Sequence, residues 1–381
     1  MENPKIRFKG YTKDWEQRKF SELYARSSEK NDGSIGMDKN ITVATMQFKN
    51  DVKVSTTEYL KTYYTFKLGD IAFEGHQSKE FRYGRFVEND IGNGIVSHIF
   101  AVFRPIQEYD LYFWKYAINN ETLMQRILAR STKASTMMHD LVTNDFLNET
   151  FLVPSVKEQK QIGAFLNKLD NLITLHQRKC EQTKKLKKYM LQKMFPQNGA
   201  KVPEIRFDGF TYDWEQRKLG DEAEEILAGG DIDKEKAVDD GVYPIYANAL
   251  TNDGIVGYYD DYYRVKAPAV TVTGRGEVGR ARARMIDFTP VVRLLAVRSN
   301  HDCYFLENAI NNHKVVVEST GVPQLTVPQL SSYDICFPKD IVEEKKIGTY
   351  FNQLDRLITL HQRKCDELKK MKKYMLQNMF I

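Results

Sequence analysis

The chain has 381 residues, 42% of them hydrophobic and 28% charged, which predicts a soluble protein of two or three domains. No apolar run reaches the roughly 18 residues of a membrane span, and the start MENPKIRFKG lacks the apolar segment of a signal peptide, so we expect a cytoplasmic protein. Four isolated cysteines exclude C-x-x-C zinc pairs, and a net charge of +5 is too small to predict nucleic-acid binding by itself.

The first element is an arm that occurs twice. Residues 4–19 read PKIRFKGYTKDWEQRK and residues 203–218 read PEIRFDGFTYDWEQRK, so twelve of sixteen positions are identical at an offset of 199. A repeat with so long a period determines the architecture before secondary structure is considered. The tryptophan and arginine of this motif either anchor an aromatic ring or bind another protein, and both alternatives stay open. The residues concerned are Trp15, Arg18, Trp214 and Arg217.

The first interior, from residue 20 to about residue 154, predicts a mixed, sheet-containing domain. Short β-branched and aromatic runs broken by turns, such as IFAVFRP at residues 99–105, are typical of strands. Lys79, Arg82 and Arg85 form a small basic cluster. This cluster is the best candidate in the first interior for a contact with nucleic acid.

A long helix follows the first interior. Apolar side chains recur at spacings of three and four over residues 162–195, with Lys and Arg between them. Because such a helix has one apolar seam, it needs a partner helix. Its own copy is the obvious partner, since the segment returns at residues 347–380 with an offset of 185.

The two helical segments carry most of the positive charge. Residues 157–195 hold ten Lys or Arg against three Asp or Glu, and residues 339–381 hold ten against six. The lysines form a solvated helix face by default, and a surface that binds a partner protein in the alternative. The candidates for that surface are Lys184, Lys188, Lys369 and Lys373.

The second interior, from residue 219 to about residue 338, also predicts a sheet-containing domain, although its sequence is largely unrelated to the first. A third repeated block, Tyr-Phe followed four residues later by Ala-Ile-Asn-Asn, starts at Tyr112 and returns at Tyr304 with an offset of 192. Two similar frames therefore enclose two different interiors. This pattern indicates one mounting that is used twice to present two different surfaces.

A glycine-rich segment in the second interior follows a predicted strand. GRGEVG at residues 274–279 matches a dinucleotide-binding pattern, but the RARAR that follows alternates like a strand, and no βαβ unit surrounds it. Six arginines against two acidic residues between Arg275 and Arg298 favour a hairpin that approaches a polyanion, with a plain structural turn as the alternative. The candidate nucleic-acid-binding residues are Thr273, Arg275, Arg280 and Arg282.

Motifs that would carry catalysis are missing from the sequence. Glu158 and Glu343 start E-x-K patterns like those of some nucleases, but each also stands third after Ser155 or Asp340, the spacing of a helix capping box. The chain has no Pro-Pro, hence no amino-methyltransferase tetrapeptide, and no Walker A loop. We therefore assign no residue to catalysis or to a metal.

The repeated motifs resemble a known family over the whole chain. Arms with Pro-x-Ile-Arg-Phe and Asp-Trp-Glu-Gln-Arg-Lys, variable interiors, and long helices with Leu-Asp-x-Leu-Ile-Thr-Leu-His-Gln-Arg-Lys are similar to the specificity subunit of type I restriction-modification systems. The resemblance implies an α+β fold with two mixed, sheet-containing target-recognition domains. Two long antiparallel helices separate these domains in a pseudo-twofold internal repeat.

The resemblance also sets the expected domain boundaries. Residues 1–154 form the N-terminal arm and the first target-recognition domain, and residues 155–196 form the first conserved long helix. Residues 197–338 form a linker, the repeated arm and the second target-recognition domain, and residues 339–381 form the second conserved long helix.

The resemblance implies a non-catalytic subunit that reads the two halves of a bipartite site in double-stranded DNA through successive major grooves. It implies docking of two methyltransferase subunits and, through them, of endonuclease and translocase subunits. S-adenosylmethionine, ATP and magnesium are then expected on the partner subunits, so this chain needs no cofactor and no membrane. Two other classes stay open: a coiled-coil scaffold without sequence readout, and a stand-alone DNA-modifying enzyme.

Overall fold

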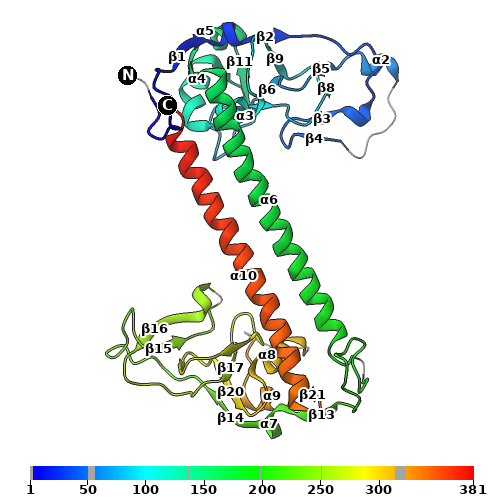
Figure 1. The fold of residues 1–381 in the computed structure, drawn as a ribbon, viewed down its shortest axis with the longest axis vertical. Coiled ribbons are helices and arrows are strands. Elements are labelled where there is room, and N and C mark those ends of the chain that lie inside the picture. Colours follow the sequence, from blue (N-terminus) through cyan, green and yellow to red (C-terminus); the bar gives the residue numbers. More distant parts are fainter. Residues whose placement is uncertain (1–2, 50–55, 136–137, 198, 250, 314–322) are drawn as a thin grey trace. The chain divides into compact units, whose positions relative to one another are not determined.

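The internal repeat is visible in the structure as two units. The computed structural model describes residues 3–49, 56–135, 138–197, 199–249, 251–313 and 323–381. Unit 1 contains Met1–His176 and Lys364–Ile381, and unit 2 contains Gln177–Arg363. Each unit therefore includes part of both long helices, α6 (Val156–Lys193, green in Figure 1) and α10 (Ile341–Asn378, orange to red).

Unit 1 contains the first arm, the first interior and the first half of helix α6. Its strands are β1 (Glu16–Lys19), β2 (Tyr24–Ser27), β3 (Ile41–Thr42), β4 (Gln47–Phe48), β5 (Tyr64–Phe66), β6 (Ile71–Glu74), β7 (Arg85–Glu88), β8 (Gly94–Val96), β9 (Ala101–Pro105), β10 (Thr132–Ala134), β11 (His139–Leu141) and β12 (Thr150–Val153). Its helices are α1 (Phe20–Leu23), α2 (Thr57–Leu60), α3 (Leu111–Ile118), α4 (Glu121–Ser131), α5 (Thr143–Asn148) and the start of α6 (Val156–Lys193).

Unit 2 contains the second arm, the second interior and most of helix α10. Its strands are β13 (Glu215–Lys218), β14 (Ala223–Ala228), β15 (Tyr243–Tyr246), β16 (Ile255–Tyr259), β17 (Ala269–Val272), β18 (Ala281–Arg284), β19 (Thr289–Pro290), β20 (Leu295–Ser299) and β21 (Asp334–Phe337). Its helices are α7 (Leu219–Glu222), α8 (Cys303–Asn312), α9 (Val327–Ser331) and α10 (Ile341–Asn378). No helix in the described ranges is long and apolar enough to cross a membrane.

Each interior has its own main sheet, and the two sheets have the same strand order although the sequences differ. In unit 1 the order is β2-β9-β6-β7 and in unit 2 it is β14-β20-β17-β18, with every neighbouring pair antiparallel. The predicted strands, one at residues 99–105 and one directly before the glycine-rich segment, are the inner strands β9 and β17 of these sheets. The expectation of two mixed, sheet-containing domains is therefore confirmed.

Each arm closes its own interior by strand pairing. β1 pairs antiparallel with β12, and β13 pairs antiparallel with β21, so the arm joins the strand that leads into the long helix. The tryptophan of each arm is buried against its own interior. In unit 1 the Trp15 ring is 5% exposed and packs edge-on against Phe113 of α3, with 6.1 Å between the ring centres. Trp214 packs in the same way against Phe305 of α8 at 5.8 Å.

The long helices run antiparallel within each unit, as predicted. In unit 1, Lys372 near the end of α10 places Nζ 2.7 and 2.8 Å from the carboxylate oxygens of Asp170 near the start of α6. In unit 2, Lys187 near the end of α6 lies 2.7 and 2.6 Å from those of Asp355. The two pairs are copies of each other at the offset of 185, so the same contact forms in both units.

The prediction of capping boxes is wrong for the two glutamates. Ser155 Oγ does accept a hydrogen bond from the Glu158 backbone N–H at 3.4 Å, as a cap should. The Glu158 carboxylate, however, is buried and accepts two hydrogen bonds from Arg7 of the arm, at 2.7 and 2.8 Å. Arg206 binds Glu343 in the same way, at 2.7 and 2.8 Å. A bidentate pair with a guanidinium supplies two charge-assisted hydrogen bonds, where a capping box would supply one from a backbone N–H, so each glutamate instead joins its arm to its helix.

Candidate nucleic-acid interface

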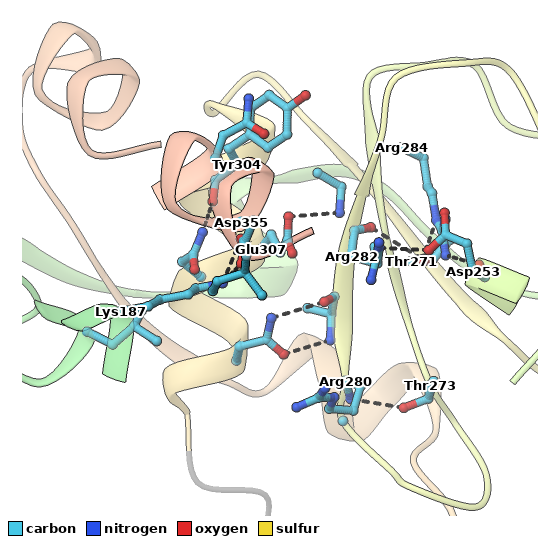
Figure 2. Close-up of a pocket in the computed structure, with 18 of the residues that line it drawn as sticks. Lys187, Asp253, Thr271, Thr273, Arg280, Arg282, Arg284, Tyr304, Glu307 and Asp355 are labelled. Carbon is cyan, nitrogen blue, oxygen red and sulfur yellow. Dashed lines mark hydrogen bonds and ion pairs between the residues drawn. The ribbon is translucent and has the colours of Figure 1, made fainter. Parts of the chain in front are cut away.

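Unit 2 contains a cleft between the sheet and the long helices, with a volume of about 880 Å³. Its walls come from β18, from the α8 side chains, and from the facing parts of α6 and α10 (Figure 2). Six basic and three acidic residues line it: Lys184, Lys187, Lys188, Arg280, Arg282 and Arg284, with Asp253, Glu307 and Asp355. The excess of positive charge suits a polyanion such as nucleic acid.

The arginines of this cleft alternate along one strand. Successive side chains of a strand point to opposite faces, so Arg280, Arg282 and Arg284 share one face of β18 and its neighbouring turn. Arg280 and Arg282 are 63% and 62% exposed, whereas Arg284 is buried. Two exposed guanidinium groups are therefore presented by β18 and the residue before it.

The outer edge of β18 is covered by side chains of α8. Asn311 accepts from the Ala281 backbone N–H at 2.9 Å and donates to the Ala281 carbonyl at 3.0 Å, as a neighbouring strand would. Glu307 accepts from the Ala283 N–H at 3.2 Å, and burial raises the pKa of its carboxyl group. These contacts fix the edge strand and explain why Asn311 belongs to the third repeated block: its copy Asn119 donates to the backbone of β7 in unit 1.

The glycine-rich segment forms the hairpin between β17 and β18. These strands pair antiparallel and are joined directly, whereas a dinucleotide site needs two parallel strands joined through a helix. A Cβ on Gly274 would lie 2.5 Å from the Arg293 carbonyl oxygen, so only glycine fits there. Thr273 is buried and lines the cleft, whereas Arg275 is exposed at the turn and does not line it.

Unit 1 has a corresponding cleft of about 1020 Å³ between β7, α3 and the long helices. Five basic and five acidic residues line it: Arg85, Lys115, Lys369, Lys372 and Lys373, with Glu80, Glu88, Asp90, Glu121 and Asp170. Two of the acidic residues are paired with lysines, Asp90 with Lys115 at 2.5 Å and Asp170 with Lys372 at 2.7 Å. Burial raises the pKa of Glu88 well above its usual value, which favours its neutral form.

Of the predicted residues in the first interior, only Arg85 lines the unit 1 cleft. Its guanidinium pairs with Glu74 at 2.7 Å and donates to the Ala44 carbonyl oxygen at 2.8 Å. Lys79 and Arg82 are exposed on the loop before β7, outside the cleft lining.

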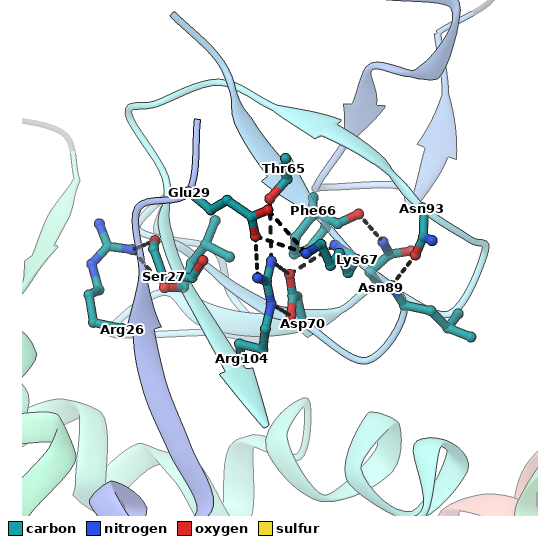
Figure 3. Close-up of polar contacts among 12 residues, drawn as sticks. Arg26, Ser27, Glu29, Thr65, Phe66, Lys67, Asp70, Asn89, Asn93 and Arg104 are labelled. Carbon is teal, nitrogen blue, oxygen red and sulfur yellow. Dashed lines mark hydrogen bonds and ion pairs between the residues drawn. The ribbon is translucent and has the colours of Figure 1, made fainter. Parts of the chain in front are cut away.

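The sheet of unit 1 is braced by an arginine on its inner strand β9. Arg104 donates to the buried carboxylate of Asp70 at 2.9 and 2.8 Å and also pairs with Glu29 (Figure 3). The hydrogen bonds from Arg104 and Lys67 lower the pKa of Glu29 to about 2. Asp70 also accepts from the Lys67 backbone N–H at 2.8 Å, so this network ties three segments of the interior together.

The predicted partner-binding residues fall into two groups. Lys184 and Lys188 line the unit 2 cleft, and Lys369 and Lys373 line the unit 1 cleft, so the structure brings them together with the predicted nucleic-acid contacts. The arm residues lie elsewhere: Trp15 and Trp214 are in the cores, whereas Arg18 pairs with Glu22 at 3.1 Å and Arg217 with Glu215 at 2.6 Å. The buried rings correspond to the anchoring alternative.

Sequence reasoning missed Lys187, Lys372 and Arg284, which also line the clefts. The repeat offered a signal for the lysines, since each is preserved at the offset of 185 together with its aspartate. It also missed large apolar residues that stay exposed on the helices. They are Leu175, Met371 and Tyr374 in unit 1, and Leu186, Tyr189 and Leu360 in unit 2, each 44% to 59% exposed.

Comparisons with known proteins agree with the repeat. A family model described as the type I restriction modification DNA specificity domain matches residues 12–185 and residues 212–370. The Mycoplasma pneumoniae type I specificity subunits S.MpnORF507P and S.MpnORF89P are 27% identical over 237 residues and 30% identical over 148 residues. These matches cover 58% and 37% of this chain, and the chain spans 62% and 43% of the length of the two relatives.

Longer matches cover nearly the whole chain at lower identity. The Methanocaldococcus jannaschii type I restriction enzyme MjaX specificity subunit is 23% identical over 413 residues, covering 94% of this chain and 91% of that protein. The crystal structure of a type I restriction-modification S subunit from M. genitalium has a TM-score of 0.67 at 15% identity, covering 100% of this chain and 99% of that one. At this identity the structural likeness shows a common fold.

Proposed function

Because the chain belongs to the type I restriction-modification DNA specificity family, we propose that it reads the two halves of a bipartite DNA site, one with each unit, and docks methyltransferase subunits. The two clefts are the observation that carries this proposal. Each lies at the same place in the repeat, between an unrelated interior and the lysines of a repeated helix. A shared frame with different reading surfaces is what an asymmetric two-part site requires.

We propose that each cleft makes two kinds of DNA contact, phosphate contacts from the helix lysines and base contacts from the interior. The lysines at positions 184, 188, 369 and 373 extend from the repeated helices and contact phosphates, which carry no sequence information. Arg280 and Arg282 extend from the variable interior, and guanidinium groups pair with the O6 and N7 atoms of guanine. Arg85 lies at the matching edge strand of unit 1, while Lys79, Arg82 and Arg275 stay candidates for contacts beside the clefts.

We assign methyltransferase docking to the exposed apolar residues of the long helices. Leu186 and Tyr189 on α6 have copies at Met371 and Tyr374 on α10, so each unit offers an equivalent apolar patch. Large exposed apolar side chains are typical of contact surfaces when they gather on one element. Two equivalent patches fit two equivalent partner subunits, which would in turn hold the endonuclease subunits.

In this proposal the chain itself is non-catalytic and works in the cytoplasm. S-adenosylmethionine, ATP and magnesium belong to the partner subunits, since the sequence carries neither the methyltransferase tetrapeptide nor a Walker A loop. Methyl transfer or DNA cleavage by the purified chain alone would contradict this assignment.

The test is the methylated sequence. The chain is expressed in a methylation-free host with a type I methyltransferase subunit that it binds, and the genome is sequenced by a method that detects methylated bases. We expect one bipartite motif. Replacing residues 20–153 by the corresponding interior of a relative should change one half of this motif and leave the other half unchanged. A change in both halves contradicts one-unit-per-half reading, and complex formation without any sequence preference supports a scaffold instead.

A further inference from the structure

A strained turn stands at the rim of the unit 2 cleft. Asn252 has φ 50° and ψ 36°, Asp253 has φ 56° and ψ 18°, and Gly254 has φ 81°. Three consecutive residues are thus in the left-handed region, which costs free energy at each residue other than glycine. Such a turn persists only where the surrounding structure holds it.

Arg284 is the residue that holds this turn. Its guanidinium donates to Asp253 Oδ2 at 2.7 Å and to the Asp253 carbonyl oxygen at 3.0 Å. It also donates from Nε to Thr271 Oγ1 at 3.0 Å, and it lies 3.7 Å from the centre of the Tyr246 ring. Arg284 is only 7% exposed, and burying a charge is costly. The hydrogen bonds of the buried guanidinium fix the position of the turn.

The turn lies beside the basic residues of the cleft. Asp253 lines the cleft and accepts from Arg282 Nε at 2.8 Å, so the turn also orients an exposed arginine (Figure 2). Asn252, next to it, is exposed, and its amide donates one hydrogen bond of 3.3 Å to the Ile255 carbonyl oxygen. Both carboxylate oxygens of Asp253 pair with arginines, so the turn itself adds no positive charge that would attract DNA in general.

Unit 1 also has an arginine-held turn at its cleft, but at the opposite end of the edge strand, because the repeated asparagines Asn119 and Asn311 bind the backbone at Phe86 of β7 and at Ala281 of β18. Met46 has φ 46°, and the turn from Ala44 to Met46 lines the unit 1 cleft. Arg85 of the edge strand β7 donates to the Ala44 carbonyl oxygen at 2.8 Å, as Arg284 of the edge strand β18 does to Asp253. Thr45, at the middle of this turn, is exposed.

We propose that these two arginine-held turns are base-reading elements, with Asn252 contacting a base edge in one half-site and Thr45 in the other. The inference rests on the proposed function and adds specificity residues to it. An amide carries a donor and an acceptor that together match N7 and the N6 amino group of adenine. A turn held rigidly to the sheet loses little entropy when it contacts a base.

The decisive variant is Asn252→Gly, because glycine keeps the left-handed backbone and removes only the amide. The chain is assayed in complex with its methyltransferase on the genomic motif and on duplexes changed at single positions. We expect discrimination to fall by about 5- to 150-fold at one base pair of one half-site, which corresponds to about 1–3 kcal/mol for a bidentate contact. Thr45→Ala should relax a position in the other half only.

The matched control is Asn300→Ala, an exposed asparagine of unit 2 that lies between β20 and α8 and not in the arginine-held turn; neither asparagine is itself part of the cleft lining. It should leave the motif unchanged. An unchanged motif for Asn252→Gly overturns the base-reading turn, while the proposed function stands as long as the wild-type complex methylates a bipartite site. Equal weakening on every sequence overturns it too, because a phosphate contact behaves so. Melting temperatures confirm that each variant is folded.

Discussion

His301 lies between two carboxylates in unit 2, with Nδ1 2.8 Å from Glu344 Oε1 and Nε2 2.9 Å from Glu222 Oε2. Its ring stacks on Phe337 at 4.2 Å. Because both ring nitrogens face acceptors, only the protonated imidazolium can donate to both. This contact joins the loop before α8 to α7 and to the first turn of α10. The copies of these positions in unit 1 are Tyr109, Leu23 and Gln159, which do not form a charged triad.

The first prediction is a loss of stability in unit 2 as the pH rises. Burial lowers the pKa of His301, but hydrogen bonds to Glu344 and Glu222 outweigh it, so the net pKa is raised above its usual value. Arg217 also faces Glu222, and the hydrogen bond from His301 is the main cause that lowers the pKa of Glu222. The stabilisation is complete below the unfolded pKa of about 6.5 and is lost as the pH rises through the folded pKa.

The measurement is thermal unfolding of the whole chain between pH 6 and pH 9. His301→Gln should unfold at a lower temperature than the wild type at pH 6, by about 2–4 °C for each kcal/mol lost. This difference should shrink as the pH increases, since the wild type then loses the same charge. A difference that stays constant with pH would show that His301 acts only through packing.

The second prediction concerns Arg104 in unit 1. Arg104→Met leaves the fully buried carboxylate of Asp70 without its cation, so we expect a loss of about 3–5 kcal/mol in the free energy of unfolding. Arg130→Met is the matched control, because its pair with Glu149 involves an arginine that is 61% exposed and should contribute at most about 1 kcal/mol. Urea denaturation measures both variants.

Adding Asp70→Asn to Arg104→Met should restore part of the lost stability, since the buried charge is then removed. If the double variant is as unstable as the single one, the loss comes from packing of the arginine stem and the ionic account is wrong. Equal losses for the Arg104 and Arg130 variants would contradict it as well.

The elements that sequence reasoning predicted are those with a local or repeated signal. The helices α6 and α10 follow from apolar spacing, and β18 follows from the alternation of RARAR. The pairing of the two helices follows from their similar apolar seams, whereas their antiparallel direction was implied only by the resemblance to the specificity subunits. These patterns lie within one segment, so they can be recognised without knowing which other segments contact it.

What the sequence did not reveal depends on contacts between distant segments. The common sheet order of the two interiors is not encoded in any similarity between them, because many sequences can satisfy one strand pairing. The role of Glu158 was missed because its partner Arg7 is 151 residues away. The lysines at 188 and 373 looked like a solvated helix face, and only the fold places each beside an interior.

The third prediction concerns the glycine repeated in both long helices. A Cβ on Gly163 would lie 2.2 Å from Asp110 Oδ1 and 2.6 Å from the backbone nitrogen of Phe113, where Asp110 caps α3. The copy Gly348 meets Asp302 at 2.0 Å in the same way. Gly163→Ala should therefore cost about 1–3 kcal/mol by overpacking, although alanine favours a helix by about 1 kcal/mol.

Ala164→Gly is the control for that variant, because residue 164 is exposed in the same turn of α6. It should lose about 1 kcal/mol through helix propensity alone. Urea unfolding of the two variants separates the effects. A Gly163→Ala variant that is more stable than the wild type would show that α3 and α6 are not in close contact in solution.

The last prediction follows from the proposed division of the clefts into phosphate contacts and base contacts. Lys188 is exposed on α6 and lines the unit 2 cleft, whereas Lys179 is exposed on the same helix and does not line it. If Lys188 neutralises one phosphate, Lys188→Ala should reduce the slope of log affinity against log salt by about 0.9, because one fewer counterion is released. The methylated sequence should stay the same, since a phosphate contact carries no base information.

Binding of the methyltransferase complex to its DNA is measured between 50 and 200 mM salt. Lys179→Ala should keep the wild-type slope, and a Lys188→Ala complex with that same slope would place the DNA away from the cleft. Failure of the Lys188→Ala complex to assemble with the methyltransferase would instead assign this lysine to the docking surface, the alternative that its position on the helix first suggested.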